Sequence, residues 1–374
     1  MNADFPSAAG NAGTAAALRT TPQQGISIQC HENDVPPFVE AALLRLYSNL
    51  FSSLAFWRVH GGADNASTYV VREEEKIVTV WLFRRDKNRV HVVNEGMALG
   101  SDEVARFAGY IFSRYPVVDL ISFHAVQAKV QHLPLPYQRY NCLEDMVLTL
   151  PSSPEEYLAS LGKSTRSYVQ RYLKKLRRDF PSFQFRWCGP EEIEEAQLQQ
   201  IVMLNRSRMA DKGKISINDD AAAQRVAQLA MECGAIGIIS LDGVIVAGTI
   251  NYRVGNNYFL DILAHDPNYN GYRVGTLCCY LTICACIDGG GSEYHFLWGM
   301  DEYKSHLLGV RRDLDDLSVY RSRTRMLLNG STVLINISAA AKRRARLWLR
   351  QARKDDRPIA RLLTWGVRTI RNKL

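Results

Sequence analysis

The sequence predicts an α/β protein with two similar halves and a basic helical tail. Residues 67–123 and residues 235–298 carry the same order of elements, namely three short strands, a helix and a further strand. A glycine-containing turn precedes the helix in the second series. The C-terminal residues 331–374 hold 12 Lys and Arg but only two acidic residues. This arrangement indicates an internal structural duplication followed by a separate basic end.

The composition is that of a soluble protein large enough for two domains. The chain has 374 residues, of which 47% are hydrophobic and 22% are charged. Its net charge of +8 comes from the tail, because the other 330 residues hold 34 Lys and Arg and 36 acidic residues. The body is therefore not a general polyanion binder, and nucleic acid is not an expected partner.

Eight cysteines are scattered along the chain without Cys-x-x-Cys spacing or a matching His pair. We therefore expect neither a metal site nor a disulfide framework, and a reducing cytoplasm as the compartment. No run approaches the ~18 consecutive apolar residues of a membrane span. Four cysteines lie in the helix of the second series, where we expect small buried apolar residues: Cys278, Cys279, Cys284 and Cys286.

The first half is expected at residues 26–150, after a disordered leader at residues 1–25 that is rich in Ala, Gly, Thr and Pro. The turn before its central helix is short, so we expect this half to be non-catalytic. Its elements are predicted as a helix at 37–54, strands at 67–72, 77–83 and 90–94, a helix at 102–114 and a strand at 117–123.

Residues 154–178 form the most basic helix of the body. Apolar and aromatic side chains occupy one stripe, and Lys and Arg cover the rest of the surface. Two interpretations stay open. Either the charged face is simply solvated, or Lys163 and Arg166 point into a catalytic groove and neutralise an anionic substrate or a cofactor phosphate. The Gly-Lys-Ser-Thr sequence at 162–165 is no P-loop, because no strand precedes it and no glycine stands five residues earlier.

The second half is expected at residues 151–325 and ends on the second series. The turn at 271–276 lies between the third strand of that series and its helix. Because the first N–H groups of a helix have no internal partner, such a turn can bind a phosphate-bearing cofactor. The elements are predicted as helices at 190–212, 219–233 and 276–288, and strands at 235–240, 244–253, 258–264 and 294–298.

Residues 266–276 carry a resemblance to a known family. The sequence Asp-Pro-Asn-Tyr-Asn-Gly-Tyr-Arg-Val-Gly-Thr is similar to the acyl-CoA pyrophosphate loop of the GNAT acetyltransferase superfamily, whose pattern is Arg/Gln-x-x-Gly-x-Gly/Ala. The pattern is often written in the longer form Tyr-Arg-Gly-x-Gly-Ile-Gly, in which Asn270 replaces the Arg and Arg273 replaces the middle Gly. The residues that match or nearly match this longer form are Tyr269, Gly271, Val274 and Gly275. Together with the basic helix, the Tyr303-Lys304 pair and the strand at 317–321, the loop resembles the FemAB-like, cellulose-biosynthesis-type branch of the superfamily.

This resemblance implies two tandem GNAT-like halves with mixed, mostly antiparallel sheets flanked by helices, of which the second carries the site. It also implies acetyl-CoA or another acyl-CoA as co-substrate. Since Arg273 brings a side chain to a place where the backbone would approach the cofactor, we expect Arg273 to contact a phosphate itself. The cofactor-binding residues implied are Asn270, Gly271, Arg273, Val274, Gly275 and Thr276.

One candidate for proton transfer lies on the strand before this turn. Side chains alternate along a strand, which predicts that Asp261 and His265 share one face and could deprotonate an acceptor amine or hydroxyl. The other interpretation is that Asp261 holds a neighbouring backbone group or Arg, while His265 caps the turn.

A second candidate cluster follows the strand at 294–298. Tyr303 could protonate a leaving thiolate, and Lys304 could bind an acyl carbonyl or a substrate anion. Asp301 lies beside them, and Trp298 is a candidate substrate contact. These residues could equally form a solvated polar loop.

The tail at residues 326–374 has a different character. From residue 342 onwards, Arg and Lys surround an apolar stripe, with Trp348 and Trp365 as interfacial anchors. This pattern predicts a helix on an anionic membrane surface, and thus a peripheral position on the inner face of the membrane. The alternative is a terminal helix packed on the body with a solvated basic face. The predicted stripe consists of Ile359, Leu362, Leu363, Val367 and Ile370.

The sequence therefore predicts an acyl-CoA-dependent N- or O-acyltransferase that transfers directly to a polar acceptor, such as an envelope polysaccharide or a lipid-linked molecule. Two alternatives remain. One is a FemAB-type transferase that uses aminoacyl-tRNA, although the coiled-coil arm often inserted in such proteins is not seen in this sequence. The other is a non-catalytic, membrane-associated stress or resistance protein that keeps the fold.

Overall fold

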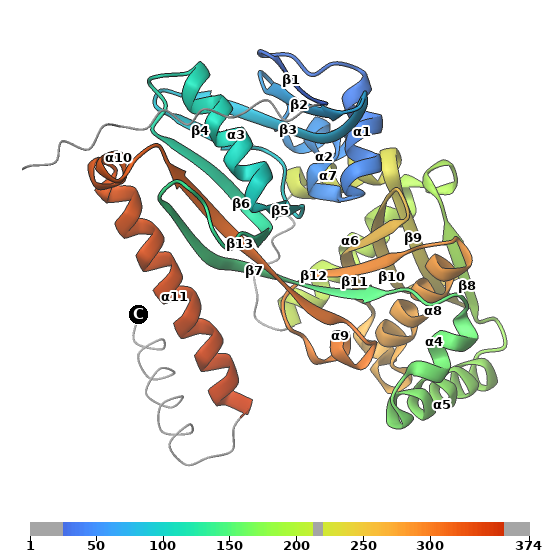
Figure 1. The fold of residues 1–374 in the computed structure, drawn as a ribbon. Helices are drawn as coiled ribbons and strands as arrows, with labels where there is room; N and C mark the ends of the chain where they lie inside the picture. Colours follow the sequence, from blue (N-terminus) through green and yellow to red (C-terminus); the bar gives the residue numbers. More distant parts are fainter. Residues whose placement is uncertain (1–24, 212–219, 355–374) are drawn as a thin grey trace, which may run out of the picture.

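A computed structural model describes residues 25–211 and 220–354 of the chain. The expected leader up to residue 24 and the apolar stripe predicted beyond residue 354 lie outside these ranges. Within them, thirteen strands form one continuous sheet with helices packed on both faces (Figure 1). No helix of the described part is long and apolar enough to cross a membrane.

The strands follow one another across the sheet in the order β1-β2-β3-β4-β6-β13-β7-β12-β11-β10-β9-β8, with β5 beside β6. Their bounds in the first half are β1 Ile26–His31, β2 Ser67–Glu73, β3 Lys76–Asp86, β4 Arg89–Val92, β5 Ala98–Gly100, β6 Leu120–Lys129 and β7 Tyr137–Thr149. Those in the second half are β8 Gln184–Cys188, β9 Gly234–Leu241, β10 Val244–Val254, β11 Asn257–His265, β12 Glu293–Trp298 and β13 Val310–Tyr320.

The helices complete the two series. In the first half they are α1 Phe38–Tyr47, η1 Leu50–Ser52, α2 Leu54–His60 and α3 Ser101–Arg114. In the second half they are α4 Pro154–Ser160, α5 Lys163–Asp179, η2 Pro190–Glu192, α6 Glu195–Asp211, α7 Asp220–Cys233, η3 Pro267–Tyr272, α8 Val274–Asp288 and α9 Glu302–His306. The basic tail contributes α10 Arg323–Leu328 and α11 Gly330–Lys354.

The strand order confirms the predicted duplication. From either edge of the sheet inward, three strands are antiparallel to their neighbours, and the fourth then runs parallel to the fifth: β4 with β6, and β11 with β12. Every other neighbouring pair along the order is antiparallel. The sheet is therefore mixed and mostly antiparallel, as expected, but the two halves share one sheet.

The halves are joined by the exchange of one strand each. β7 comes from the first half of the chain and pairs with β12 of the second. β13 comes from the second half and pairs with β6 of the first, and β7 and β13 pair with each other along ten register positions. The predicted boundary near residue 150 separates the two halves along the sequence. In the sheet, however, β7 of the first half lies beside strands of the second, and β13 of the second half lies beside a strand of the first.

Two helices predicted as continuous are broken. The segment at 37–54 divides into α1, η1 and the start of α2, because Ser48 adopts a left-handed conformation with φ 42° and the Asn49 side chain accepts a hydrogen bond from the amide of Phe51. The segment at 154–178 divides into α4 and α5 at Leu161 and Gly162, whose ψ angles of 141° and 145° are extended.

The two halves have equivalent cores. α3 packs Phe107 against Trp81 and Phe123 of the first half, with ring centroids 5.1 and 6.1 Å away. α8 occupies the same place in the second half and is buried over most of its length, including Cys278 and Cys279. The opposite face is covered by α1 and α2 in the first half and by α6 and α7 in the second.

A chain of charged groups, buried at His295 and Asp145 and half-buried at Glu293 and Arg312, holds the exchanged strands at the junction. His295 of β12 places its Nδ1 2.6 Å from Asp145 Oδ2 of β7 and its Nε2 3.3 Å from Glu293 Oε2. Glu293 in turn accepts two hydrogen bonds from Arg312 of β13, at 2.7 and 3.0 Å. Phe259 of β11 stacks on the His295 ring at 4.3 Å. Four strands, two of them exchanged, are therefore tied together at one point.

This chain of charges predicts how stability depends on pH. Burial disfavours the charged imidazole of His295, but the hydrogen bonds to Asp145 and Glu293 outweigh burial and raise its pKa above 6.5. The hydrogen bonds from His295 and Arg312 lower the pKa of Glu293 to about 2. The contribution of His295 to the free energy of unfolding is thus complete below pH 6.5. It is lost as the pH rises through the raised pKa of the folded protein. The Glu293 contribution is complete above pH 4.5 and is lost towards pH 2.

We therefore expect the free energy of unfolding to decline as the pH rises above 6.5, by up to about 1.4 kcal/mol per pH unit from this group. Urea unfolding of the wild type and of His295→Gln at several pH values measures this decline. The variant, which has no titrating imidazole, should show a flatter curve over the same range. Parallel curves for the two proteins would exclude His295 as the source.

Candidate active site

The loop after β11 has the geometry of an anion-binding turn. The Asp266 carboxylate accepts a hydrogen bond from the Asn268 amide at 2.9 Å, which starts η3. Arg273 then adopts a left-handed backbone conformation, with φ 57° and ψ 32°, and α8 begins at the next residue. This is the backbone region that glycine occupies most readily. The GNAT loop that this turn resembles has a glycine at the position of Arg273. Arg273 adopts a backbone conformation that suits that glycine.

Gly275 is required by the close approach of His265. A Cβ atom at Gly275 would lie 2.6 Å from His265 Nδ1. The other ring nitrogen, Nε2, is 3.0 Å from Oδ1 of Asn270. The imidazole thus lies between η3 and the first turn of α8. This arrangement favours the interpretation in which His265 holds the turn.

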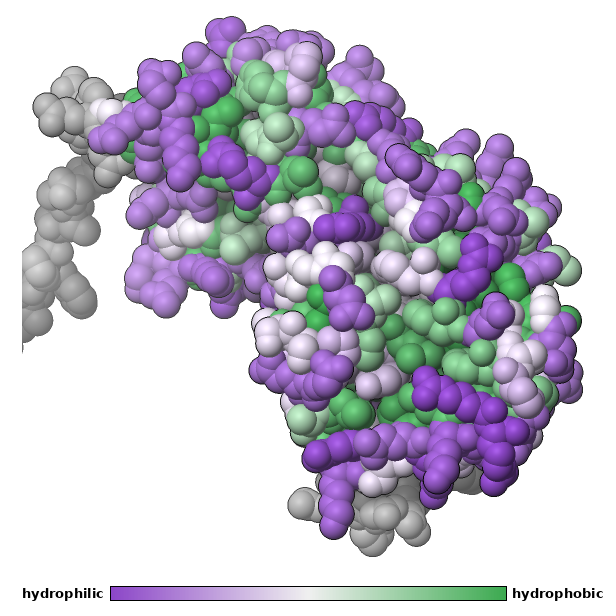
Figure 2. Space-filling model, turned by 90° about the vertical axis from the view of Figure 1, so that its right-hand side faces the viewer, coloured by the Kyte–Doolittle hydropathy of each residue, from purple (hydrophilic) through white to green (hydrophobic). Residues whose placement is uncertain are grey.

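The basic helix α5 lies against this turn. Lys175 Nζ donates a hydrogen bond to the carbonyl oxygen of Gly271 at 3.3 Å and lies 4.4 Å from the centre of the Tyr272 ring. The Tyr272 hydroxyl donates to Asp179 Oδ2 at 3.2 Å. Figure 2 shows a band of hydrophilic side chains along the lower edge of the molecule, at the level of α5. A positive surface therefore borders the turn.

The two residues of α5 that we expected at the groove lie at the other end of the helix. Lys163 is its exposed first residue, and Arg166 donates a hydrogen bond back to the carbonyl oxygen of Leu161 at 3.4 Å. The residues that contact the turn come from later turns of α5. Among them are Tyr168 beside Thr276, Tyr172 beside Arg273, and Lys175.

The strands on either side of α8 diverge at the site. β11 and β12 pair only through residues 257–259 and 293–295. Beyond these residues, the described part of the chain has no ladder between them. The divergence opens next to the turn at the end of β11 and next to α9 after β12, so groups from both strand ends surround the gap.

Asp261 occupies a β-bulge in β11. Ile262 pairs with Ile250 of β10, whereas Leu260 pairs with Asn251, so Asp261 is the extra residue. The Tyr252 hydroxyl of β10 donates to Asp261 Oδ2 at 2.7 Å. The expectation that Asp261 and His265 share a face is wrong, because a bulge shifts the alternation by one residue. Asp261 lies on the side of α6 and α7, and His265 packs on α8.

The Asp261 residue is exposed to solvent at the surface, but many protein atoms surround its carboxyl group. Desolvation raises the pKa of its carboxyl group, while the hydrogen bond from Tyr252 and the charge of His60 oppose that rise. Burial and the neighbouring Asp261 carboxylate also raise the pKa of Tyr252 far above its usual value. A carboxylate with a raised pKa is a stronger proton acceptor than an ordinary aspartate.

Tyr303 and Lys304 differ in what they can offer a substrate. Burial, with a smaller effect of the nearby Asp301 carboxylate, raises the pKa of Tyr303, so the phenol keeps its proton. Lys304 is buried and donates to three backbone carbonyl groups, those of residues 296, 297 and 298, at 2.8, 3.2 and 2.5 Å. No N–H of Lys304 is left for an acyl carbonyl, so its role is to fix the end of β12.

Trp298 and Asp301 lie at the edge of the site. The Trp298 side chain is 38% exposed and its ring lies 5.2 Å from that of Phe51 in η1. Asp301 is exposed at the start of α9. Through Phe51 and His60, the first half of the chain therefore contributes side chains next to the site of the second. Nothing in the sequence near these two residues signals this, because the contact depends on how the halves are joined.

Residues 163–305 match the family model described as acetyltransferase (GNAT) domain. This segment of the chain is a GNAT-type domain. The second half of the chain is thus a GNAT-type acyltransferase domain, and the turn at 266–276 occupies the junction of the fourth strand and the following helix of that domain.

Solved structures share this fold at low sequence identity. FemX has 8% identity and a TM-score of 0.58, over 80% of this chain and 99% of that one. The L-PGS structure from Bacillus licheniformis has 12% identity and a TM-score of 0.47, over 83% of this chain and 98% of that one. The similarity to FemX concerns the fold, and the second value is too low to support an argument. No curated protein sequence matches the chain.

The packing of the GNAT turn can be tested with a pair of glycine variants. In Gly275→Ala the new methyl group must displace the His265 ring, so we expect a loss of about 1–3 kcal/mol in the free energy of unfolding. In Gly271→Ala the new atom meets nothing within 4 Å, and a change within about 0.5 kcal/mol is expected. Equal effects in urea unfolding would contradict the His265 contact.

Proposed function

We propose that the second half transfers an acyl group from acyl-CoA to an amine or hydroxyl group of a polar acceptor. The observation that carries this proposal is the turn at 266–276, which leads into α8 beside the gap between β11 and β12. A phosphate at the turn would place the rest of a long, extended donor along this gap. The acyl end could then reach the groups that surround it.

The charges around the turn support an anionic donor. The start of α8 offers backbone N–H groups and the positive end of the helix dipole. Arg273 is exposed there, and Lys175 lies next to Gly271. Because Gly275 is buried beneath His265, the phosphates would approach from the side of Gly271 and Arg273.

The chemistry requires two proton transfers and no covalent enzyme intermediate. The acceptor nitrogen or oxygen attacks the thioester carbon, its proton passes to Asp261, and the C–S bond breaks. Tyr303 then donates a proton to the departing thiolate. The raised pKa of Asp261 makes its carboxylate a stronger base. Tyr303 keeps its proton until the thiolate forms, and its hydroxyl can donate a hydrogen bond to the departing sulfur. Holding both substrates at the gap supplies the remaining catalysis by proximity.

An aminoacyl-tRNA is the second candidate donor, and one observation favours it. The Lys and Arg side chains of α5 are exposed over the length of the helix, which is a larger basic surface than the phosphates of CoA need: Lys163, Arg171, Lys174, Arg177 and Arg178. A nucleic-acid donor would be bound mainly by such contacts and would be released steeply by salt.

Calorimetry on the full-length protein distinguishes these donors. We expect one-to-one binding of acetyl-CoA with a dissociation constant between about 1 μM and 1 mM. Arg273→Ala should weaken it about tenfold, because a charge-assisted hydrogen bond is lost. Arg273→Gly relieves the left-handed backbone as well and serves as the comparison. If the glycine variant binds as well as the wild type, the backbone rather than the guanidinium holds the phosphate.

The proposal fails if acetyl-CoA, longer acyl-CoAs and CoA all show no binding at millimolar concentration while aminoacyl-tRNA binds. Binding without loss of the thioester, over a panel of amine and hydroxyl acceptors, would instead support a protein that keeps the fold without turnover.

We also propose that α11 brings the enzyme to an anionic membrane surface, where a lipid-linked or envelope acceptor would be found. The inner face of this helix is polar: Arg343 and Arg350 pair with the buried Glu144 of β7, and Asn336 donates to Gln138 and Ser318. Its outer face carries exposed apolar side chains, among them Leu334 at 67%, Ile337 at 52% and Trp348 at 54%. A helix with its apolar side turned to solvent needs a covering surface.

Co-sedimentation with vesicles tests the membrane role. The double variant Leu334→Ser/Trp348→Ser should lower pelleting with phosphatidylglycerol-containing vesicles several-fold, because it removes the residues that would enter the bilayer surface. Val117→Ser, an exposed apolar residue of the body, is the matched control and should pellet like the wild type. Equal pelleting of the double variant and the control excludes α11 as the membrane contact.

A further inference from the structure

The first half has lost the long turn but contains a separate cluster of reactive side chains. It lies where three neighbouring strands, β6, β13 and β7, cross the middle of the sheet. His124 belongs to β6, Asp316 to β13 and Cys142 to β7. One ligand atom of each, an imidazole nitrogen, a carboxylate oxygen and a thiol sulfur, lies within 4.8 Å of the other two.

Two bulges, one in β6 and one in β7, create this meeting point. The pairing of β13 with β6 shifts between Asp315 and Leu317, so Asp316 faces His124 and the left-handed Ala125. The pairing of β13 with β7 shifts at Cys142, which is the extra residue between the partners of Leu314 and Asp315. Such shifts turn side chains away from regular alternation and are frequent next to functional sites.

The surrounding groups hold the carboxylate in place. Asp316 Oδ1 is 2.6 Å from His124 Nδ1 and accepts a hydrogen bond from the Ala125 amide at 3.2 Å. Asp316 Oδ2 accepts a hydrogen bond from the Tyr140 hydroxyl at 2.7 Å. Cys142 is half-buried, and its thiol donates to the carbonyl oxygen of Leu314 at 3.4 Å. The carboxylate thus has a fixed orientation, as metal ligands usually do.

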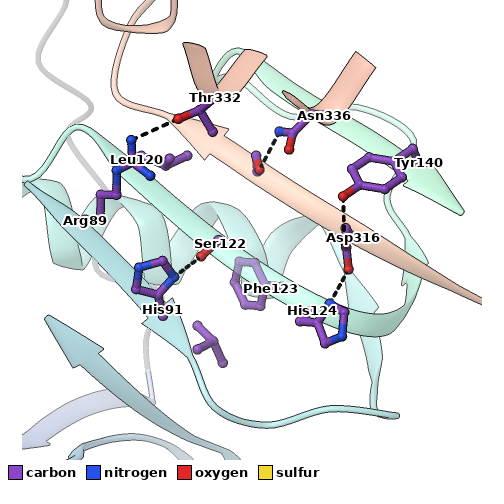
Figure 3. Close-up of a pocket in the computed structure, with 12 residues that line it drawn as sticks. Arg89, His91, Leu120, Ser122, Phe123, His124, Tyr140, Asp316, Thr332 and Asn336 are labelled. Carbon is purple, nitrogen blue, oxygen red and sulfur yellow. Dashed lines mark hydrogen bonds and ion pairs between the residues drawn. The ribbon is translucent and has the colours of Figure 1, made fainter. Parts of the chain in front are cut away.

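A pocket opens beside the cluster (Figure 3). It has a volume of about 260 Å³ and lies over the sheet next to α11. His124, Tyr140 and Asp316 line one end, and Arg89, His91 and Ser122 line the other. His124 and Asp316 are linked in the view, and the His91 ring lies 2.6 Å from the Ser122 hydroxyl. Space for a water molecule or a small ligand therefore adjoins two of the three potential ligands, His124 and Asp316.

We propose that His124, Cys142 and Asp316 bind a divalent transition-metal ion such as Zn²⁺, with its fourth position open to this pocket. A nitrogen, a sulfur and an oxygen donor form a set that suits zinc. Ligand atoms around tetrahedral zinc lie about 3.3–3.8 Å apart, given Zn–S of about 2.3 Å and Zn–N of about 2.0 Å. His124 Nδ1 and Asp316 Oδ1 are now 2.6 Å apart, and no two of the three ligand atoms are more than 4.8 Å apart, so small movements of the side chains would give this geometry.

Metal binding would change the protonation of two ligands. The Cys142 thiol would release its proton to solvent, because the thiolate is the ligand. His124 would bind through Nδ1 and carry its remaining proton on Nε2. The hydrogen bond between His124 and Asp316 would be replaced by two metal bonds, while Tyr140 would remain bonded to the carboxylate. Regular sequence spacing predicted no metal site, since these ligands come from three strands and depend on two bulges.

The test is a titration of the full-length, metal-free protein with Co²⁺ as a spectroscopic probe, in the presence of a reductant that does not bind metals. A one-to-one complex should show the intense near-ultraviolet band of a thiolate-to-cobalt bond, and Zn²⁺ should displace it. Cys142→Ser should abolish the band, and His124→Ala should weaken binding more than about 100-fold. Tyr140→Phe, which removes only a partner of Asp316, should weaken it about 10-fold or more.

Cys233→Ser is the matched control, because this half-buried cysteine also donates to a backbone carbonyl but lies far from the cluster. It should titrate like the wild type, and circular dichroism reports whether each variant is folded. His124 is 56% exposed, so its replacement tests the site even if the cysteine variant is unstable. No thiolate band at millimolar Co²⁺, or an undiminished band in folded Cys142→Ser, overturns the proposal.

Discussion

The exchange of β7 and β13 is the constraint on which the rest of the molecule depends. The last long strand of each half pairs with a strand of the other half. Neither half's part of the sheet is therefore complete without residues from the other half of the chain. At the crossing, the chain of Asp145, His295, Glu293 and Arg312 compensates buried charges by pairing them. Removing Asp145 or His295 would leave its buried partner without that ion pair, which costs more stability than the intact pair contributes.

The crossing also sets the geometry of the candidate active site. β7 pairs with the edge of β12 that faces away from β11. This pairing holds β12 in place where it diverges from β11. Lys304 then fixes the irregular end of β12 by donating to three of its carbonyl groups. β7 and Lys304 therefore hold β12 apart from β11, and no backbone pairing spans the gap between these strands in the described part of the chain. The same crossing brings Phe51 and His60 of the first half next to Trp298 and Asp261 of the second.

What the sequence could predict was set by local pattern. Periodicity and turn residues placed most strands and helices, and the loop at 266–276 identified the GNAT superfamily from consecutive residues. The helix breaks at Ser48 and Gly162 were missed, because each depends on the conformation of one or two residues within an otherwise helical pattern. The strand exchange and the partners of His295, which is 150 residues from Asp145, leave no local signal.

Among the site residues, too, those with a local sequence signal were predicted, and those that depend on distant contacts were not. Gly275 and its neighbours were recognised because the turn is contiguous. The predicted common face of Asp261 and His265 failed because one inserted residue reverses alternation, and strand bulges are not visible in hydrophobic periodicity. Lys304 was placed at the correct strand end, but which atoms its ammonium group contacts depends on the path of the backbone. Lys175 was one of many basic residues on α5 until the structure placed it beside Gly271.

We propose that the phosphates of an acyl-CoA bind the turn between β11 and α8 in the second half. Hydrogen exchange followed by mass spectrometry, with and without acetyl-CoA, tests this claim most directly. The account predicts that added acetyl-CoA slows exchange in the peptide covering residues 266–277, with little change at residues 95–103, the equivalent place in the first half. Protection confined to the first half, or a bound donor that leaves residues 266–277 unchanged, would contradict it.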